Sequence, residues 1–461
     1  MAAVQDHITA LPDELLHDIV ASIADINEPH PLSDSDQKTP SLGTQSTLNN
    51  LRALALTSRR FYPIAQQVLY HTFCLCDHSR RRKFFRTIVE KPSLAKHVRN
   101  VFFTPTFYQL SREPPPTDLQ CFRRALHELG PLSPELSLQW YRRIRQGNPA
   151  LELICLLVRL ENLQRFQLVA LDPELKEHFV IFLNTLHWYI NHHQVGDILT
   201  RLEELYVDIQ DTSVVSATRA LLPLRNLRKM YLSGPSDNAA AKRDYQKEFS
   251  ARNIRDLSCI SSKLSVDALK FLLLQVEGLE SLHYDYSTIR QSPTGDFLSV
   301  LQPHKQSLKS LRVTAQFDQW DRIATSFATQ QPWSFEDFPV LAHIEVPDFA
   351  LVGIEGTNTY AHGFCTLPPR LKSLTSTACL YEEKTLQFLI DVASDRASFP
   401  ALSEITFRGR THDKIHLNTM VARLGTVCAS RGIAFAHRET VYTSTTNCPA
   451  CEDYGCWDCM P

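Results

Sequence analysis

The chain has 461 residues, of which 43% are apolar and 21% charged, and its formal net charge is −2. This composition is typical of a globular protein and excludes a largely disordered chain. The near-neutral charge gives no electrostatic case for a nucleic acid or an acidic membrane as partner, and no apolar run approaches the ~20 residues that span a bilayer. The N-terminus has no secretory signal pattern, so we expect a cytoplasmic or nuclear protein with its 12 cysteines reduced.

The N-terminal segment predicts a short amphipathic helix. Pro12 stands where a first-turn proline is tolerated, and Asp13 and Glu14 follow where the helix dipole favours acidic residues. Apolar residues then recur at helical spacing and form one broad stripe. Its members are Leu11, Leu15, Leu16, Ile19, Val20 and Ile23.

A polar segment at 25–47, rich in Pro, Ser, Asp and Gln, predicts a flexible loop. A second helical stripe follows through Leu54, Phe61, Ala65 and Leu69, and Pro63 favours a break in it. Two or three short helices bury little apolar surface by themselves. The unit therefore needs a partner or a following domain to cover it.

Two sequence patterns occur here in a fixed order: Leu-Pro-Asp-Glu-Leu-Leu-His-Asp-Ile from Leu11, and Ser-Arg-Arg-Phe-Tyr from Ser58. With them, residues 8–70 resemble the F-box motif in the form common in fungal proteins, apart from the insert at 25–47. The resemblance implies a three-helix F-box over 8–75 that docks on a Skp-type adaptor. The residues that would make or support the docking face are Leu11, Pro12, Leu15, Leu16, Ile19, Leu54, Leu56, Ser58 and Phe61.

The basic run from Arg80 to Lys83 precedes Phe84, Phe85, Ile88 and Val89. Apolar residues behind a basic run favour the solvated face of a helix over a nuclear address or a nucleic-acid patch.

From residue 95 an apolar-x-x-apolar-x-x-apolar-x-apolar template recurs. Each copy predicts a short strand whose alternate side chains share one face, followed in several copies by a helical segment. The anchors that open the strands are Val101, Phe166, Leu205, Met230, Leu257, Leu282, Leu311, Ile344, Leu374, Ile405 and, weakly, Ile433. From 205 onward they lie 25 to 33 residues apart. A unit of one strand and one return helix buries its apolar face only by stacking on its neighbours.

The repeats resemble leucine-rich repeats, in the irregular form that follows F-boxes, although the usual Asn or Cys ladder position is mostly missing. The predicted fold class is therefore α/β: a three-helix F-box followed over 76–440 by an irregular solenoid, with parallel strands on its concave side and helices outside. The interval 104–150 is too long for one repeat and is interpreted as an insertion, with helical pieces near Phe122–Leu129 and Leu136–Arg145. A β/α barrel or a doubly wound sheet would share the βα alternation, but the short period and the Leu-x-x-Leu run-in favour the solenoid.

In such a solenoid the residues that alternate with the anchors face out of the strand wall. Aromatic and arginine residues there are the kind that dominate binding energy. The predicted substrate-binding residues are Glu204, Tyr206, Asp208, Lys229, Tyr231, His283, Asp285, Arg312, His343, Glu345, Glu404 and Arg408.

No catalytic motif or phosphate-binding loop is found in the sequence. The tail at 441–461 holds two Cys-x-x-Cys pairs four residues apart, made by Cys448, Cys451, Cys456 and Cys459. Four thiolates could hold one structural zinc ion, but the pairs are usually ~15–20 residues apart, and a reduced thiol tail is an equal alternative. No cofactor is otherwise expected.

The resemblance implies an adaptor and not an enzyme: a substrate-recognition subunit of a Skp–cullin–F-box ubiquitin ligase, which holds an unidentified protein substrate on its repeats. The alternative is a protein-binding repeat scaffold outside the ligase, whose F-box-like segment caps the solenoid. An enzyme with a site built from distant residues is the weakest of the three hypotheses.

Overall fold

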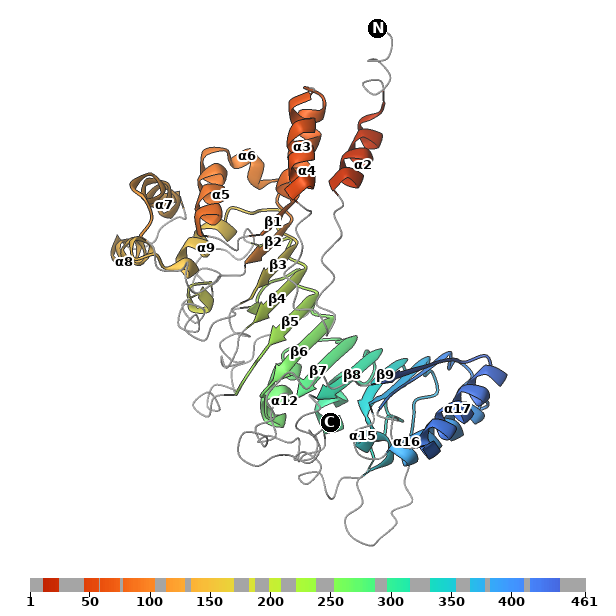
Figure 1. The fold of residues 1–461 in the computed structure, drawn as a ribbon. Helices are drawn as coiled ribbons and strands as arrows, with labels where there is room; N and C mark the ends of the chain where they lie inside the picture. The colour runs from red at the N-terminus through yellow and green to blue at the C-terminus, as the bar shows by residue number, and fades with distance from the viewer. Residues whose placement is uncertain are drawn as a thin grey trace, which may run out of the picture. The chain divides into compact units, whose positions relative to one another are not determined.

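The computed structural model describes residues 11–24, 45–57, 59–74, 78–103, 113–128, 134–169, 182–186, 199–208, 221–237, 253–286, 297–315, 332–353, 365–377, 382–409 and 415–439. The chain forms two compact units, Met1–Arg255 with Gln275–Glu277, and Asp256–Leu274 with Gly278–Pro461. Both are α/β units built on parallel strands in sequence order (Figure 1).

The first unit begins with helices and continues into strands. Its described helices are α2 (Asp13–Ala24), α3 (Gln45–Thr57), α4 (Phe61–His71), α5 (His78–Glu90), α6 (Pro92–Ala95), α7 (Pro116–Glu128), α8 (Pro134–Arg145) and α9 (Pro149–Leu157). Its strands are β1 (Thr72–Cys74), β2 (Asn100–Phe103), β3 (Arg165–Leu168), β4 (Glu204–Asp208) and β5 (Lys229–Ser233).

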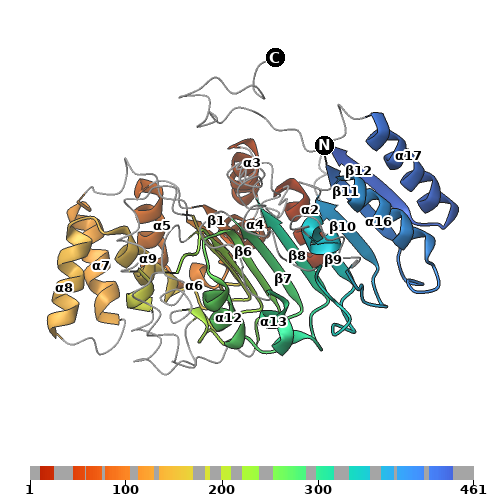
Figure 2. The same ribbon diagram turned by 90° about the horizontal axis from the view of Figure 1, so that it is seen from below.

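In the second unit strands and helices alternate. Its strands are β6 (Asp256–Ser262), β7 (Ser281–Tyr286), β8 (Ser310–Ala315), β9 (His343–Pro347), β10 (Ser373–Thr377), β11 (Glu404–Gly409) and β12 (Ala434–Glu439). Its described helices are α12 (Val266–Leu274), α13 (Phe297–Leu301), the 3-10 turn η4 (Gln302–His304), α15 (Asp348–Val352), α16 (Glu382–Ser394) and α17 (Ile415–Ser430). The helices lie on one side of the strands (Figure 2).

The strands predicted at the anchors are confirmed, and the anchor residues of neighbouring strands pair with one another. In the first unit Val101 pairs with Phe166, and Phe166 with Leu205. In the second unit the same register holds from Leu257 on β6 to Ile405 on β11, with all pairs parallel. The last strand departs from the prediction, because Phe435, and not Ile433, pairs with Ile405. Strand β1 was not predicted; it follows α4 directly and pairs with β2.

The Leu-x-x-Leu segment that precedes the strand in the template forms a turn closed by a backbone hydrogen bond between its two leucines. The Leu163 N–H donates to the Leu160 carbonyl at 3.1 Å, and the same bond recurs at Leu202 and Leu402. The polypeptide then enters the next strand with both leucines buried. The three-residue spacing of the template thus follows from an i to i+3 hydrogen bond.

The asparagine ladder, which was expected to be mostly missing, is present in part. Four residues before the anchor, Asn162 Nδ2 donates to the Lys96 carbonyl at 2.8 Å, and Asn226 and Asn253 donate to the carbonyls of Thr200 and Arg225. Ser307 takes the same position in β8's repeat, with its hydroxyl 2.8 Å from the Leu279 carbonyl. The ladder satisfies turn carbonyls that the strand pairing leaves unbonded.

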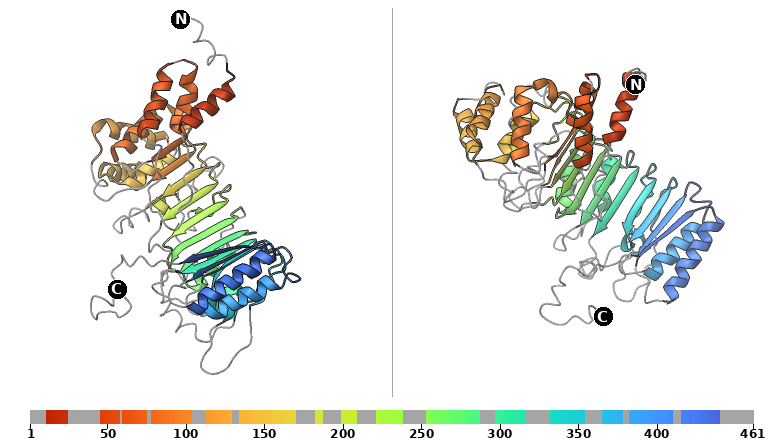
Figure 3. Two further views of the ribbon diagram at one scale, coloured as in Figure 1. Left: turned by 45° about the vertical axis from the view of Figure 1, so that its right-hand side comes forward. Right: turned by 45° about the horizontal axis from the view of Figure 1, so that its top comes forward.

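The cores lie between the strands and the helices. In the second unit the rings of Phe297 and Trp333 stack at 5.0 Å between centroids, and Phe349 of α15 meets Trp333 edge to face. Helices α16 and α17 lie along β10 to β12 on the same side (Figure 3). The opposite sides of the strands carry polar residues.

Candidate functional sites

Helices α2, α3 and α4 pack on one another around a small core. Leu16, Val20 and Ala65 are fully buried there, together with Leu51 and Phe61. Pro63 lies in the first turn of α4, where its missing N–H breaks no helical bond, and the predicted break falls before it. The stripe expected from Leu54 to Leu69 is therefore two helices.

Arg60, in the turn between α3 and α4, ties this turn to the start of α2. Its guanidinium donates to the Leu11 carbonyl at 2.5 Å and to Asp13 Oδ1 at 2.7 Å. Because it engages both a backbone oxygen and a carboxylate, it fixes the approach of α2 to α4.

The apolar residues predicted for docking divide into an inner and an outer set. Leu16 and Phe61 are core residues, and Leu11 and Leu54 pack partly buried against the same core. The side chains of Leu15, Ile19 and Leu56 are instead 48%, 41% and 87% exposed. Tyr62 of α4 is 49% exposed. Pro12 is also exposed, and Ser58 lies outside the described residues. Leu15 and Ile19, four residues apart on α2, form an apolar surface that the core does not require.

The first-unit polar face consists of side chains that alternate with the anchors on β3, β4 and β5. Glu204 lies between two cations, 2.6 Å from Arg165 Nε and 2.9 Å from Lys229 Nζ. Partial burial raises the pKa of Glu204, but the hydrogen bonds from Lys229 and Arg165 outweigh this and hold it below its usual value. Arg165 was not among the predicted residues, because β3's outward positions were not assigned to the wall.

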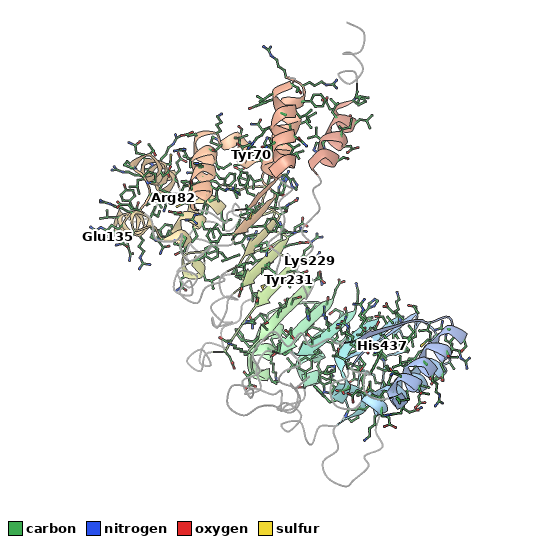
Figure 4. The ribbon with its side chains drawn as sticks, viewed as in Figure 1. Tyr70, Arg82, Glu135, Lys229, Tyr231 and His437 are labelled. Carbon is green, nitrogen blue, oxygen red and sulfur yellow. The ribbon has the colours of Figure 1, made fainter. Side chains whose placement is uncertain are left out.

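Next to this charged row, Tyr206 and Tyr231 stack with their centroids 6.2 Å apart. Burial, with the nearby Asp208 carboxylate, raises the pKa of Tyr206 to about 12. Asp208, which was predicted for the binding surface, is only 5% exposed and so offers little of its side chain to a partner. Figure 4 shows Lys229 and Tyr231 together on β5.

The second-unit polar face covers β7 to β11. Glu345 on β9 forms ion pairs with two arginines: its Oε2 lies 3.2 Å from Arg312 Nε of β8, and its Oε1 accepts a hydrogen bond from Arg408 Nη1 of β11 at 2.6 Å. Arg408 comes from two strands away and so lies across β10, where Thr377 is its register partner. The predicted Arg312, Glu345 and Arg408 are thus brought into one contact chain.

The other predicted residues of this face form smaller contacts. Asp285 accepts from the Thr314 hydroxyl at 3.0 Å and from the Ser261 backbone N–H at 3.1 Å, while His283 Nε2 lies 3.4 Å from the same hydroxyl. His343 Nδ1 lies 3.1 Å from Ser373 Oγ, and Glu404 is exposed at the same end of the strands.

The basic run from Arg80 to Lys83 was expected to lie on the solvated face of a helix, and this is wrong for two of its arginines. Arg81 and Arg82 are 3% and 4% exposed, and both donate to Glu152 of α9, which is 2% exposed. Arg81 Nη2 lies 2.6 Å from Oε2, and Arg82 Nη2 lies 2.8 Å from Oε1. The sequence of a basic run does not show which of its arginines will pair with a buried carboxylate more than 60 residues away.

The four cysteines predicted as zinc ligands lie outside the described residues. Within the described part of the chain, no group of three or more His, Cys, Asp or Glu could hold a metal ion. Burial raises the pKa of the thiols of Cys155 and Cys259 to about 12, so these two remain protonated and act as apolar core residues.

No described helix is long and apolar enough to cross a membrane. No protein-family model and no curated protein matches the sequence.

Proposed function

We propose that this protein is a substrate receptor of a Skp–cullin–F-box ubiquitin ligase. Helices α2 to α4 would form the F-box that docks on the Skp-type adaptor, and the strand faces of an irregular leucine-rich-repeat solenoid would hold a protein substrate. The receptor itself performs no chemistry. It raises the effective concentration of the substrate beside the ubiquitin that the ligase transfers.

The observation that carries the proposal is the apolar outer surface of the helix trio. Leu15, Ile19 and Leu56 are exposed while the core beneath them closes on Leu16 and Phe61. Large apolar side chains left outside a complete core favour a protein interface. They are also the positions at which the F-box resemblance expects contact with the adaptor.

The parallel strands support the second half of the proposal. Their run-in turns and partial asparagine ladder recur from repeat to repeat, as a leucine-rich solenoid requires.

The test is capture of the Skp-type adaptor of the source organism by the full-length chain. We compare the wild type with Leu15→Ala/Leu56→Ala and with a control, Leu138→Ala/Leu274→Ala, which removes two leucines that are 50% and 55% exposed on other helices. Each leucine buried in the complex is worth ~1.5–3 kcal/mol, so the first variant should lose at least ~100-fold in adaptor affinity and the control nothing.

Both variants should melt close to the wild type, because neither removes a core side chain. Equal capture by all three proteins would contradict the proposed docking face. No capture by a folded wild type would contradict the ligase role altogether.

One observation favours the alternative of a scaffold with a helical cap. Strand β1 continues directly from α4, and Phe73 on it stacks on Phe84 of α5 with centroids 3.5 Å apart. The trio is therefore joined to the first strand through α4, whose Tyr70 ring lies 5.8 Å from that of Phe73, as a solenoid cap would be. A stable protein that captures no adaptor is the result this alternative predicts.

A further inference from the structure

The charged residues of the helix trio are separated by sign. Helix α2 holds three carboxylates, on Asp13, Glu14 and Asp18, and no Lys or Arg. The segment from Gln45 to His71, which includes α3 and α4, holds three arginines and no Asp or Glu. Because Arg60 and Asp13 pair with each other at 2.7 Å, two carboxylates remain on α2, and two arginines remain on α3 and the turn after it.

These two arginines are Arg52 of α3 and Arg59 of the turn. Both side chains are exposed, and neither has an ion pair among the described residues. Arg52 precedes Leu56 by four residues, so the two side chains lie on one face of α3. Arg59 follows Leu56 by three residues, just before α4 begins. The most exposed leucine of the trio is thus flanked in the sequence by two arginines that the fold itself does not neutralise.

We call the set Arg52, Leu56, Arg59 and Tyr62 the α3–α4 patch. Leu56 is 87% exposed and Tyr62, in the first turn of α4, is 49% exposed. The cores of protein interfaces are enriched in tyrosine and arginine and depleted in Lys, Asp and Glu, and the patch has this composition. A partner that covers its apolar residues also covers its arginines, so that partner has to supply the negative charge.

We propose that the surface of the Skp-type adaptor that covers the α3–α4 patch is acidic, with Asp or Glu carboxylates opposite Arg52 and Arg59 and apolar side chains against Leu56 and Tyr62. The carboxylates of α2 repel the same surface. The separation of charge within the trio therefore admits the adaptor in one orientation, and the arginines accelerate its association. This inference deepens the proposed adaptor docking and rests on that part of the proposed function.

The experiment measures the rate at which the full-length chain associates with the Skp-type adaptor of the source organism, at low and at high salt. Arg52→Glu/Arg59→Glu should lower the association rate constant at low salt about tenfold, because it replaces attraction by repulsion. Arg52→Gln/Arg59→Gln, which only removes the charge, should have a smaller effect in the same direction. Both differences from the wild type should shrink at high salt, where the charges are screened.

The matched control is Arg123→Glu/Arg142→Glu, on α7 and α8 of the same unit. It changes the net charge by the same amount, and both arginines are exposed and have no ion pair among the described residues. Its association rate should stay within about twofold of the wild type, and all variants should melt close to the wild type, because they alter exposed side chains. Equal slowing by the control would show a general effect of net charge and overturn the proposal.

A cross-linking measurement identifies the partner groups. Arg52→Lys/Arg59→Lys keeps the charge and places an amine at each position, and a carbodiimide joins an amine to a carboxylate that it contacts. Mass spectrometry should find links from position 52 or 59 to Asp or Glu of the adaptor. A complex that forms at the wild-type rate but yields no such link would overturn the acidic surface.

The remaining outcomes separate this inference from the proposed function. Adaptor capture at a rate that depends neither on salt nor on Arg52 and Arg59 would overturn the inference and leave the docking proposal standing. No capture by a folded wild type would contradict the docking proposal, and the inference with it. A wild type that is dimeric without the adaptor and monomeric after Arg52→Glu/Arg59→Glu would show that a second copy covers the patch, and would overturn the choice of the adaptor.

Discussion

At the residue scale, two clusters in this protein place two arginines on one glutamate, with opposite consequences. Arg81 and Arg82 are buried with Glu152, where leaving either charge unpaired is expensive. Arg312 and Arg408 share Glu345 at a partly exposed face, where solvent reaches the three side chains and screens their charges. Burial decides which of the two clusters is structural.

Glu152→Gln should therefore destabilise the first unit strongly. The substitution keeps the shape of the side chain but removes the buried carboxylate that both guanidiniums share, at a cost of ~3–5 kcal/mol. The control is Glu128→Gln, which removes a 41% exposed carboxylate paired with Arg124 and Arg159 and should cost less than ~1 kcal/mol. Urea unfolding of both variants measures the difference, and equal midpoints would show that the buried cluster contributes no specific stability.

At the element scale, one buried hydrogen bond joins η4 to α12, two return segments of the second unit. His304 at the end of η4 is 2% exposed, and its Nε2 lies 3.0 Å from the carbonyl of Leu273 on α12. Burial lowers the pKa of His304 below 6.5, and the hydrogen bond to Leu273 opposes this only in part. The imidazole is thus held neutral in the native state.

This histidine predicts a pH dependence of stability. Since its pKa is lower in the folded than in the unfolded chain, its contribution is fully present above pH 6.5 and is lost as the pH falls through the folded pKa. The slope is at most ~1.4 kcal/mol per pH unit. His304→Gln should flatten the decline in urea midpoint between ~pH 7.5 and 5.5, and His416→Gln, on the exposed side of α17, should not. The same decline in both variants would exclude His304 as its source.

At the scale of the whole molecule, each described strand pairs only with the strands before and after it within its unit. Stability in such an array is close to a sum of local terms and nearest-neighbour terms. A destabilising substitution should therefore raise local opening mainly in its own and the neighbouring repeats, whereas in a single globular core it would destabilise the whole domain.

Leu16→Ala tests this locality. Leu16 is fully buried in the helix trio, so its truncation should cost ~2–5 kcal/mol. Hydrogen exchange should accelerate in α2, α3 and α4, while the amides of β8 to β11 keep the protection of the wild type. Faster exchange throughout both units would show that the protein unfolds as one cooperative body.

The sequence by itself determined the repeated strands, because an apolar pair that recurs at similar intervals is buried when each strand stacks in register on the next. It predicted every anchor strand from β2 to β11, the start of α2, the helices α7 and α8, and the residues that alternate with the anchors. It missed β1, whose three residues are too few to show a period, and it placed the last anchor at Ile433 instead of Phe435.

Only the tertiary structure decided which polar residues meet. Glu345 and Arg408 lie 63 residues apart in the sequence. They contact each other at 2.6 Å because β9 and β11 are separated in the sheet only by β10. In the same way, Glu152 contacts Arg81 and Arg82, which lie 71 and 70 residues away in the sequence, and Leu15 stays outside the core that takes in Leu16. Periodicity fixes which face a side chain occupies, but burial and ion pairing depend on what the rest of the chain brings to that face.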